Sequence, residues 1–168
     1  MSQSQKLILW LAQGFGIGRV PWAPGTFGSV LGIGFFALLL WPGNGWIMAG
    51  GIIVSIGVSV WLCGEGEKIL GKTDPGSVVM DEVVAIPICF SGWLIARPEP
   101  WPSVGALFVD HWWVVLAAFV LFRFFDIAKP WPVGASQRLP GGLGITIDDI
   151  LAAVYVSLIL AAAAKIGW

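Results

Sequence analysis

The sequence predicts an all-α fold, a compact polytopic membrane bundle of about five apolar helices. Three observations predict it. Of the 168 residues, 57% are hydrophobic and 11% are charged, whereas soluble domains carry about 25% charged residues. A third is that no charged residue occurs between Phe27 and Cys63. The length suits a single domain, residues 1–168. The net charge of −1 gives no reason to expect a nucleic-acid partner.

Five apolar runs are the expected spans: residues 27–41, 46–63, 83–96, 104–122 and 150–168. A span needs about 20 apolar residues. The second run meets this length directly, and the fourth does so if it accommodates Asp110 and His111. The first and third runs are short, so they would borrow flanking residues or thin the bilayer locally. Four spans plus a half-buried element is the alternative. Glycine-rich runs permit close helix packing, also between the protomers of a homo-oligomer.

The remaining polar chemistry falls into three islands, residues 14–26, 64–82 and 123–149. Two apolar runs separate each neighbouring pair of islands, so all three are expected on one side of the membrane. Seven of the nine Lys and Arg residues lie on that side, which the positive-inside rule places in the cytoplasm. Eight of the ten acids lie there as well. Acids do not set topology, so their concentration needs another cause.

The first island is a Gly- and Pro-rich loop, in which Thr26 is expected to cap the following helix and Ser29 lies shortly beyond it. A loop of this kind at a helix N-terminus can cradle an anion. No Gly-Lys-Ser/Thr sequence follows, so the loop is not a Walker A motif. On its glycines alone, a plain turn is the favoured interpretation.

Two pairs of adjacent acids each stand directly before an apolar run: Asp81 with Glu82, and Asp148 with Asp149. Helix capping and the helix dipole explain one acid at each position better than two. The pairs therefore indicate a function beyond capping.

The third island begins with Arg123, Asp126 and Lys129 at spacings of three, so that the three side chains share one face of a helix. Pro130 follows directly, which predicts that this helix ends at Lys129. An acid between two cations on one face suits the binding of an anion beside a carboxylate site.

Carboxylates gathered at one end of a bundle favour a bound cation, because two of them about 4 Å apart repel by roughly 4 kcal/mol at an effective dielectric of 20. Oxygen ligands without Cys or His indicate Mg²⁺. The expected metal-binding and catalytic residues are Asp81, Glu82, Asp126, Asp148 and Asp149. Positive charge for an anionic substrate group would come from Arg123, Lys129 and Lys72, with help from Thr26 and Ser29. Together these are the parts needed for phosphoryl chemistry.

Four stretches in order, residues 24–29, 74–84, 122–132 and 141–150, resemble the motifs of the phosphatidylglycerophosphatase A family. The resemblance covers about residues 14–153. It departs from the family at Ala85, Ala152 and Ala153, close to positions where the family usually has Gly.

The resemblance implies Mg²⁺-dependent hydrolysis of the phospholipid phosphatidylglycerophosphate to phosphatidylglycerol and inorganic phosphate, a step of phospholipid biosynthesis. It implies an active site facing the cytoplasm at the bacterial inner membrane. Water activated by the metal, or one of the carboxylates, would attack phosphorus. Which acid is a ligand and which a base stays open at this point.

A small membrane transporter or channel with an acidic ion site is the alternative function. Asp110 with His111 would resemble a relay, but a loop or interfacial pair is the favoured interpretation of these two residues. The acids cluster on one side instead of following the spans, which disfavours a transporter or channel. A non-catalytic scaffold would not need paired acids. The lone histidine and the missing Cys-x5-Arg and Asp-x-Asp motifs disfavour other phosphatase mechanisms. Cys63 and Cys89 are expected to be packing residues without a disulfide.

Overall fold

A computed structural model describes residues 1–97 and 100–167. These residues form eight α-helices and one short 3₁₀ helix, with no strand among them, so the all-α prediction is confirmed. The elements in chain order are α1 Gln3–Ala12, η1 Ile17–Arg19, α2 Pro24–Leu40, α3 Gly45–Leu70, α4 Met80–Ala96, α5 Val104–Val109, α6 Trp112–Ala128, α7 Val133–Ser136 and α8 Gly142–Lys165.

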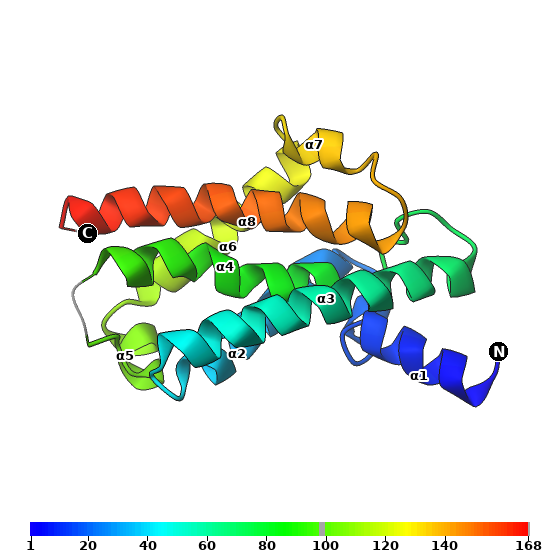
Figure 1. The fold of residues 1–168 in the computed structure, drawn as a ribbon, viewed down its shortest axis with the longest axis horizontal. Helices are drawn as coiled ribbons and strands as arrows, with labels where there is room; N and C mark the ends of the chain where they lie inside the picture. Colours follow the sequence, from blue (N-terminus) through cyan, green and yellow to red (C-terminus); the bar gives the residue numbers. More distant parts are fainter. Residues whose placement is uncertain (98–99, 168) are drawn as a thin grey trace.

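Helix α4 is the centre of the bundle. Figure 1 shows α8, α4 and α3 running beside one another along the long axis. The ring of Phe90 on α4 stacks on Phe36 of α2 with centroids 4.0 Å apart, and the backbone N–H of Gly92 donates to Ser157 Oγ on α8 at 2.9 Å. Trp93 completes this core without any exposed surface. The contacts fix α2 and α8 on either side of α4, which is what positions the site described below.

The predicted fourth span, residues 104–122, is not one helix. Ser103 Oγ accepts from the N–H of Ala106 and begins α5, which ends after six residues at Val109. The N–H groups of Asp110 and His111 then both donate to the carbonyl of Ala106, and the chain turns before α6 begins. Asp110 and His111 thus interrupt, with a turn, an apolar run that hydropathy alone predicts as one helix. The condition for a single span, that Asp110 and His111 be accommodated within one helix, is therefore not met, and α6 extends on to Ala128.

The last apolar helix also differs from its prediction, because α8 begins at Gly142 and not near residue 150. Trp168, the final residue of the predicted run, lies outside the described residues. The two cysteines are buried and free, as expected.

Two helices, α3 with 26 residues and α8 with 24, are long and apolar enough to cross a membrane by length and composition. Helix α2 is a shorter apolar helix. Large apolar side chains stand exposed on the outer surface, among them Leu38 on α2 and Ile53 and Val54 on α3. An outer surface of this kind suits an apolar surrounding.

The loops that carry the three polar islands lie at the same end of the bundle. In Figure 1 the loop after α1, the loop between α3 and α4 and the segment around α7 all lie toward the right, whereas α5 and the C-terminal end of α8 lie at the left. The residues expected to carry the chemistry are therefore gathered at one end.

Candidate active site

The two acidic pairs reach the same place from different positions on their helices. Asp81 and Glu82 lie in the first turn of α4, where they were expected. Asp148 and Asp149 lie well inside α8, because that helix begins at Gly142. The capping interpretation of the second pair is thereby excluded. The packing of α8 on α4 brings the pairs together, and carboxylate oxygens of Asp81, Glu82 and Asp149 all lie within 4.8 Å of one another.

We call these three residues, Asp81, Glu82 and Asp149, the unpaired trio. Asp81 Oδ1, Glu82 Oε2 and Asp149 Oδ2 are buried and have no hydrogen-bond partner within the described chain. Asp81 is 7% exposed and Asp149 is 3% exposed. Two ionised carboxylates at 4.8 Å repel by about 3.5 kcal/mol at an effective dielectric of 20. Three such groups fit a bound cation, and all-oxygen ligands are those of a hard divalent ion.

The other two predicted acids, Asp126 and Asp148, are already neutralised by cations. Asp126 Oδ2 lies 2.7 Å from Arg123 Nη1, and Asp126 Oδ1 lies 3.8 Å from Lys129 Nζ. Lys129 Nζ donates to Asp148 Oδ2 at 2.5 Å, and Asp148 Oδ1 accepts the N–H of Asp149 at 3.0 Å. We call Asp126 and Asp148 the paired duo. The expectation that Arg123, Asp126 and Lys129 share one helix face is confirmed.

Lys129 marks the end of α6, as the proline after it predicted. It caps the helix with a left-handed backbone, φ 42°, and its amide donates to Phe125 O. Partial burial alone would lower the pKa of Lys129, but the hydrogen bond from its ammonium to Asp148 and the charges of Asp148 and Asp126 outweigh it and raise that pKa. The side chain is therefore a positive charge held at the carboxylates.

Arg123 connects the trio to the duo. Its Nη1 lies 3.7 Å from Glu82 Oε1 as well as 2.7 Å from Asp126. Its Nε is buried and has no hydrogen-bond partner within the described residues, whereas Nη1 is held by these ion pairs. A buried guanidinium with one uncommitted donor beside a carboxylate site suits an oxyanion with several oxygens.

The N-terminus of α2 closes the site from the other side. A Cβ placed on Gly25 would lie 2.1 Å from Glu82 Oε1 and 3.0 Å from Arg123 Nη1, so a larger residue there would displace the two site side chains. The prediction that Thr26 caps α2 is wrong: the helix begins at Pro24, whose fixed φ suits the first helical position. Ser29 is buried and its hydroxyl donates to Gly25 O at 2.9 Å, so it serves the helix backbone.

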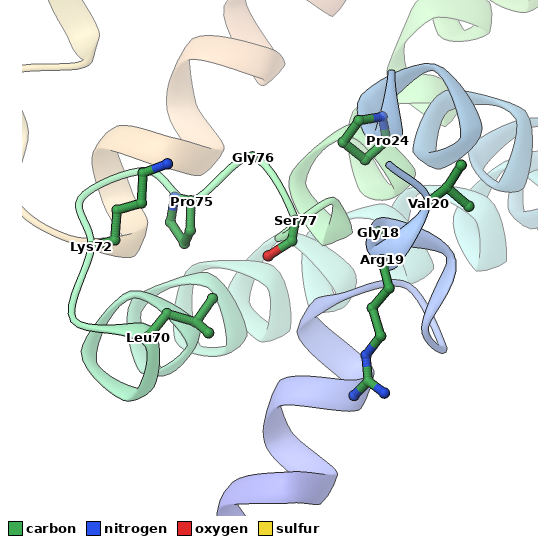
Figure 2. Close-up of a pocket in the computed structure, with 9 residues that line it drawn as sticks. All are labelled: Gly18, Arg19, Val20, Pro24, Leu70, Lys72, Pro75, Gly76 and Ser77. Carbon is green, nitrogen blue, oxygen red and sulfur yellow. The ribbon is translucent and has the colours of Figure 1, made fainter. Parts of the chain in front are cut away.

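Lys72 forms no ion pair with the carboxylates among the described residues. Figure 2 shows it on the loop before α4, at the rim of an open pocket of about 500 Å³ that Arg19, Pro24 and Ser77 also line. Arg19, the one charged residue of the first island, was not among the predicted site residues. Its Nε donates to Gln13 Oε1 at 2.7 Å.

Buried carboxylates that outnumber the cations beside them, next to a guanidinium with an uncommitted donor, define a class of site suited to metal-assisted phosphoryl chemistry. The family model described as phosphatidylglycerophosphatase A matches residues 10–164. The chain belongs to this family, and is an enzyme of the phosphatase class.

Two relatives carry the name of this family, and a third carries the name of another phosphatase. A phosphatidylglycerophosphatase A of Escherichia coli is 37% identical over 89% of this chain and 79% of its own length. One of Haemophilus influenzae is 37% identical over 89% and 84%. A Bacteroides thetaiotaomicron protein with the provisional name phosphatidylinositol-3-phosphatase is 35% identical over 97% of both chains. No solved structure matches the chain.

Proposed function

We propose that the chain is a Mg²⁺-dependent phosphomonoesterase that hydrolyses phosphatidylglycerophosphate to phosphatidylglycerol and inorganic phosphate. The observation that carries the proposal is the unpaired trio beside the uncommitted Nε–H of Arg123. Family membership and the names of two relatives supply the substrate. The third relative's name refers to another lipid phosphomonoester, so the shared chemistry is a phosphate monoester on a lipid headgroup.

The metal would be held by the unpaired trio, whose three partnerless oxygens match the need of a cation for oxygen ligands. When bound, Mg²⁺ would neutralise the carboxylates and polarise the phosphate for attack by water. The sequence interpretation placed all five acids on the metal. The ion pairs of Asp126 and Asp148 favour a different role for these two, which is to position Arg123 and Lys129.

The chain's own groups divide the remaining work. Arg123 Nε and Nη1 and Lys129 Nζ bind the non-bridging phosphate oxygens and stabilise the charge that builds on them. A carboxylate of the trio accepts the proton of the attacking water as its oxygen bonds to phosphorus. The bond from phosphorus to the headgroup oxygen breaks, and that oxygen takes the proton back from the same carboxyl group and leaves as a hydroxyl.

The proposal includes a multi-pass membrane location of one domain, residues 1–168, with α2, α3, α4, α6 and α8 as spans. The length and hydropathy of α3 and α8 support it, as do the exposed apolar side chains. Helices α2, α4 and α6 have 17 residues each, a length of about 25 Å. The hydrocarbon core is about 30 Å thick, so local thinning accompanies them. The site end faces the cytoplasm of the bacterial inner membrane.

Phosphate release from the purified protein in detergent tests the proposal. The substrates are phosphatidylglycerophosphate and phosphatidylinositol 3-phosphate, each with Mg²⁺ and with EDTA. We expect Mg²⁺-dependent release that is faster from phosphatidylglycerophosphate. Faster release from the inositol lipid would overturn the substrate, and release that persists in EDTA would overturn the metal. If neither lipid is hydrolysed, an ion-flux assay in liposomes tests the alternative of a transporter.

A further inference from the structure

Helix α2 borders an apolar groove on each of its two sides. One groove, lined by α2, α3 and α4, has a volume of about 820 Å³. The other has a volume of about 270 Å³ and is lined by Val30 and Ile33 of α2, Phe108 of α5 and Trp112, Leu116 and Phe119 of α6. We call this smaller groove the α2–α6 seam. Only a groove that continues into the carboxylate site can hold part of a substrate.

Both walls of the α2–α6 seam run toward the end of the bundle that holds the site. Thr26 lies one helical turn from Val30 on α2, and Arg123 lies one turn from Phe119 on α6. Residues four apart share a helix face. The Arg123 side chain reaches the N-terminus of α2, since a Cβ on Gly25 would lie 3.0 Å from Arg123 Nη1. The apolar seam therefore begins one turn from the guanidinium that is proposed to bind phosphate.

The larger groove is separated from the carboxylates by close contact between α2 and α4. A Cβ on Gly28 would lie 2.9 Å from Val79 Cβ, and one on Gly32 would lie 2.7 Å from Ile86 Cγ1. Backbones packed this closely leave no passage for a lipid between the two helices. The greater volume of this groove is therefore no argument for substrate binding.

We propose that one acyl chain of the phosphate-bearing lipid lies in the α2–α6 seam, an inference that rests on the proposed function. The stretch of α6 from Trp112 to Arg123 is about 16 Å long, which is half of the roughly 30 Å hydrocarbon core. A chain in the seam thus stays within one leaflet while the headgroup reaches Arg123. Arg123 and Lys129 at the site complement the phosphate of an anionic lipid, and the apolar walls of the seam complement its acyl chain.

Matched valine substitutions test the inference. Val30 lines the seam and Val120 of α6 lies outside both grooves, yet both side chains are 53% exposed. Val58, 46% exposed, lines the larger groove. Each is changed to Trp, and KM is measured for dihexadecanoyl and for dihexanoyl phosphatidylglycerophosphate. We expect Val30→Trp to raise the long-chain KM about tenfold relative to the short-chain KM, as when two methylene groups lose their burial. Val120→Trp and Val58→Trp should leave this ratio within about twofold of wild type.

Equal ratios for Val30→Trp and Val120→Trp would overturn the inference, and a raised ratio for Val58→Trp would place the chain in the larger groove. Failure of the proposed function is a different result, since wild type would then hydrolyse neither lipid. If Val30→Trp does not fold, a photoreactive diazirine lipid with its label at mid-chain is used on wild type. Cross-links on residues 112–119 support the seam, and cross-links confined to α3 contradict it.

Discussion

The five acids at one end of this bundle fall into two groups that the sequence does not separate. Asp126 and Asp148 each face a cation at 2.5–2.7 Å. Asp81, Glu82 and Asp149 come within 4.8 Å of one another, and each has a buried oxygen without a hydrogen bond inside the described chain. The negative charge of the paired duo is balanced by cations of the protein, whereas the unpaired trio has more negative charge than nearby cations balance.

The contrast shows how one cluster can divide two tasks. Burial of like charges without counter-charge is costly to the fold, and an added cation removes that cost. The paired duo instead holds a guanidinium and an ammonium in place for a substrate. Substitution in the trio should therefore affect metal binding, whereas substitution in the duo should affect substrate binding.

The largest effect is expected for Asp149→Asn. Loss of a metal-binding carboxylate should lower kcat/KM by at least about a hundredfold to a thousandfold. Without metal the same change should raise the melting temperature, because it removes one buried negative charge from an unbalanced group. Phosphate release and thermal unfolding in EDTA measure the two effects. Asp110→Asn, an exposed acid at the far end of the bundle, is the matched control. A variant with wild-type activity would show that the trio is not catalytic.

The next largest effect is expected for Arg123→Ala. It removes the donors proposed for phosphate and leaves Glu82 and Asp126 without their shared cation. We expect kcat/KM to fall about a hundredfold, with a melting temperature in EDTA below that of wild type. Exposed Arg138, changed to Ala, serves as the control. Unchanged kinetics in a folded Arg123 variant would exclude its role in substrate binding.

A smaller effect is expected for Asp148→Asn, which weakens the contact that positions Lys129. Losses of about tenfold to a hundredfold are typical when a supporting residue is changed. The change should raise KM more than it lowers kcat and leave the affinity for Mg²⁺ near that of wild type. If Asp148→Asn lost as much Mg²⁺ affinity as Asp149→Asn, the trio and the duo would not have separate roles.

The smallest effect is expected for Lys72→Ala. This exposed lysine lines the pocket of Figure 2, which no residue of the trio lines. A solvent-screened charge there should change kcat/KM by less than about threefold. A fall as large as that of Arg123→Ala, measured under the same conditions, would bring Lys72 into the substrate site.

Much of this arrangement follows from local sequence signals. The position of Asp81 and Glu82 could be predicted because an apolar run begins directly after them, and the end of α6 because Pro130 follows Lys129. The start of α8 could not be predicted from its glycine-rich sequence. A Cβ on Gly142 would lie 1.9 Å from the carbonyl oxygen of Val60 on α3, so this glycine serves tertiary packing and does not mark a loop.

The division into trio and duo was beyond the sequence for a similar reason. Asp148 and Asp149 are neighbours on one helix, yet one meets Lys129 and the other meets Asp81 and Glu82. That difference depends on the packing of α8 between α4 and α6, which no spacing along the chain contains. The break at Asp110 agrees with the loop interpretation of Asp110 and His111, but the bounds of α5 and α6 could not be predicted, because hydropathy averages over two polar residues in a long apolar run.

Divalent-ion binding to the folded protein tests the central claim most directly. Isothermal titration with Mg²⁺ would compare wild type with Asp149→Asn from the trio and Asp126→Asn from the duo, all in the same detergent. We predict that Asp149→Asn loses binding by a factor of about a hundred or more and that Asp126→Asn stays within about threefold of wild type. Equal losses in both variants, or wild-type binding in Asp149→Asn, would contradict the separation of a metal-binding trio from a cation-holding duo.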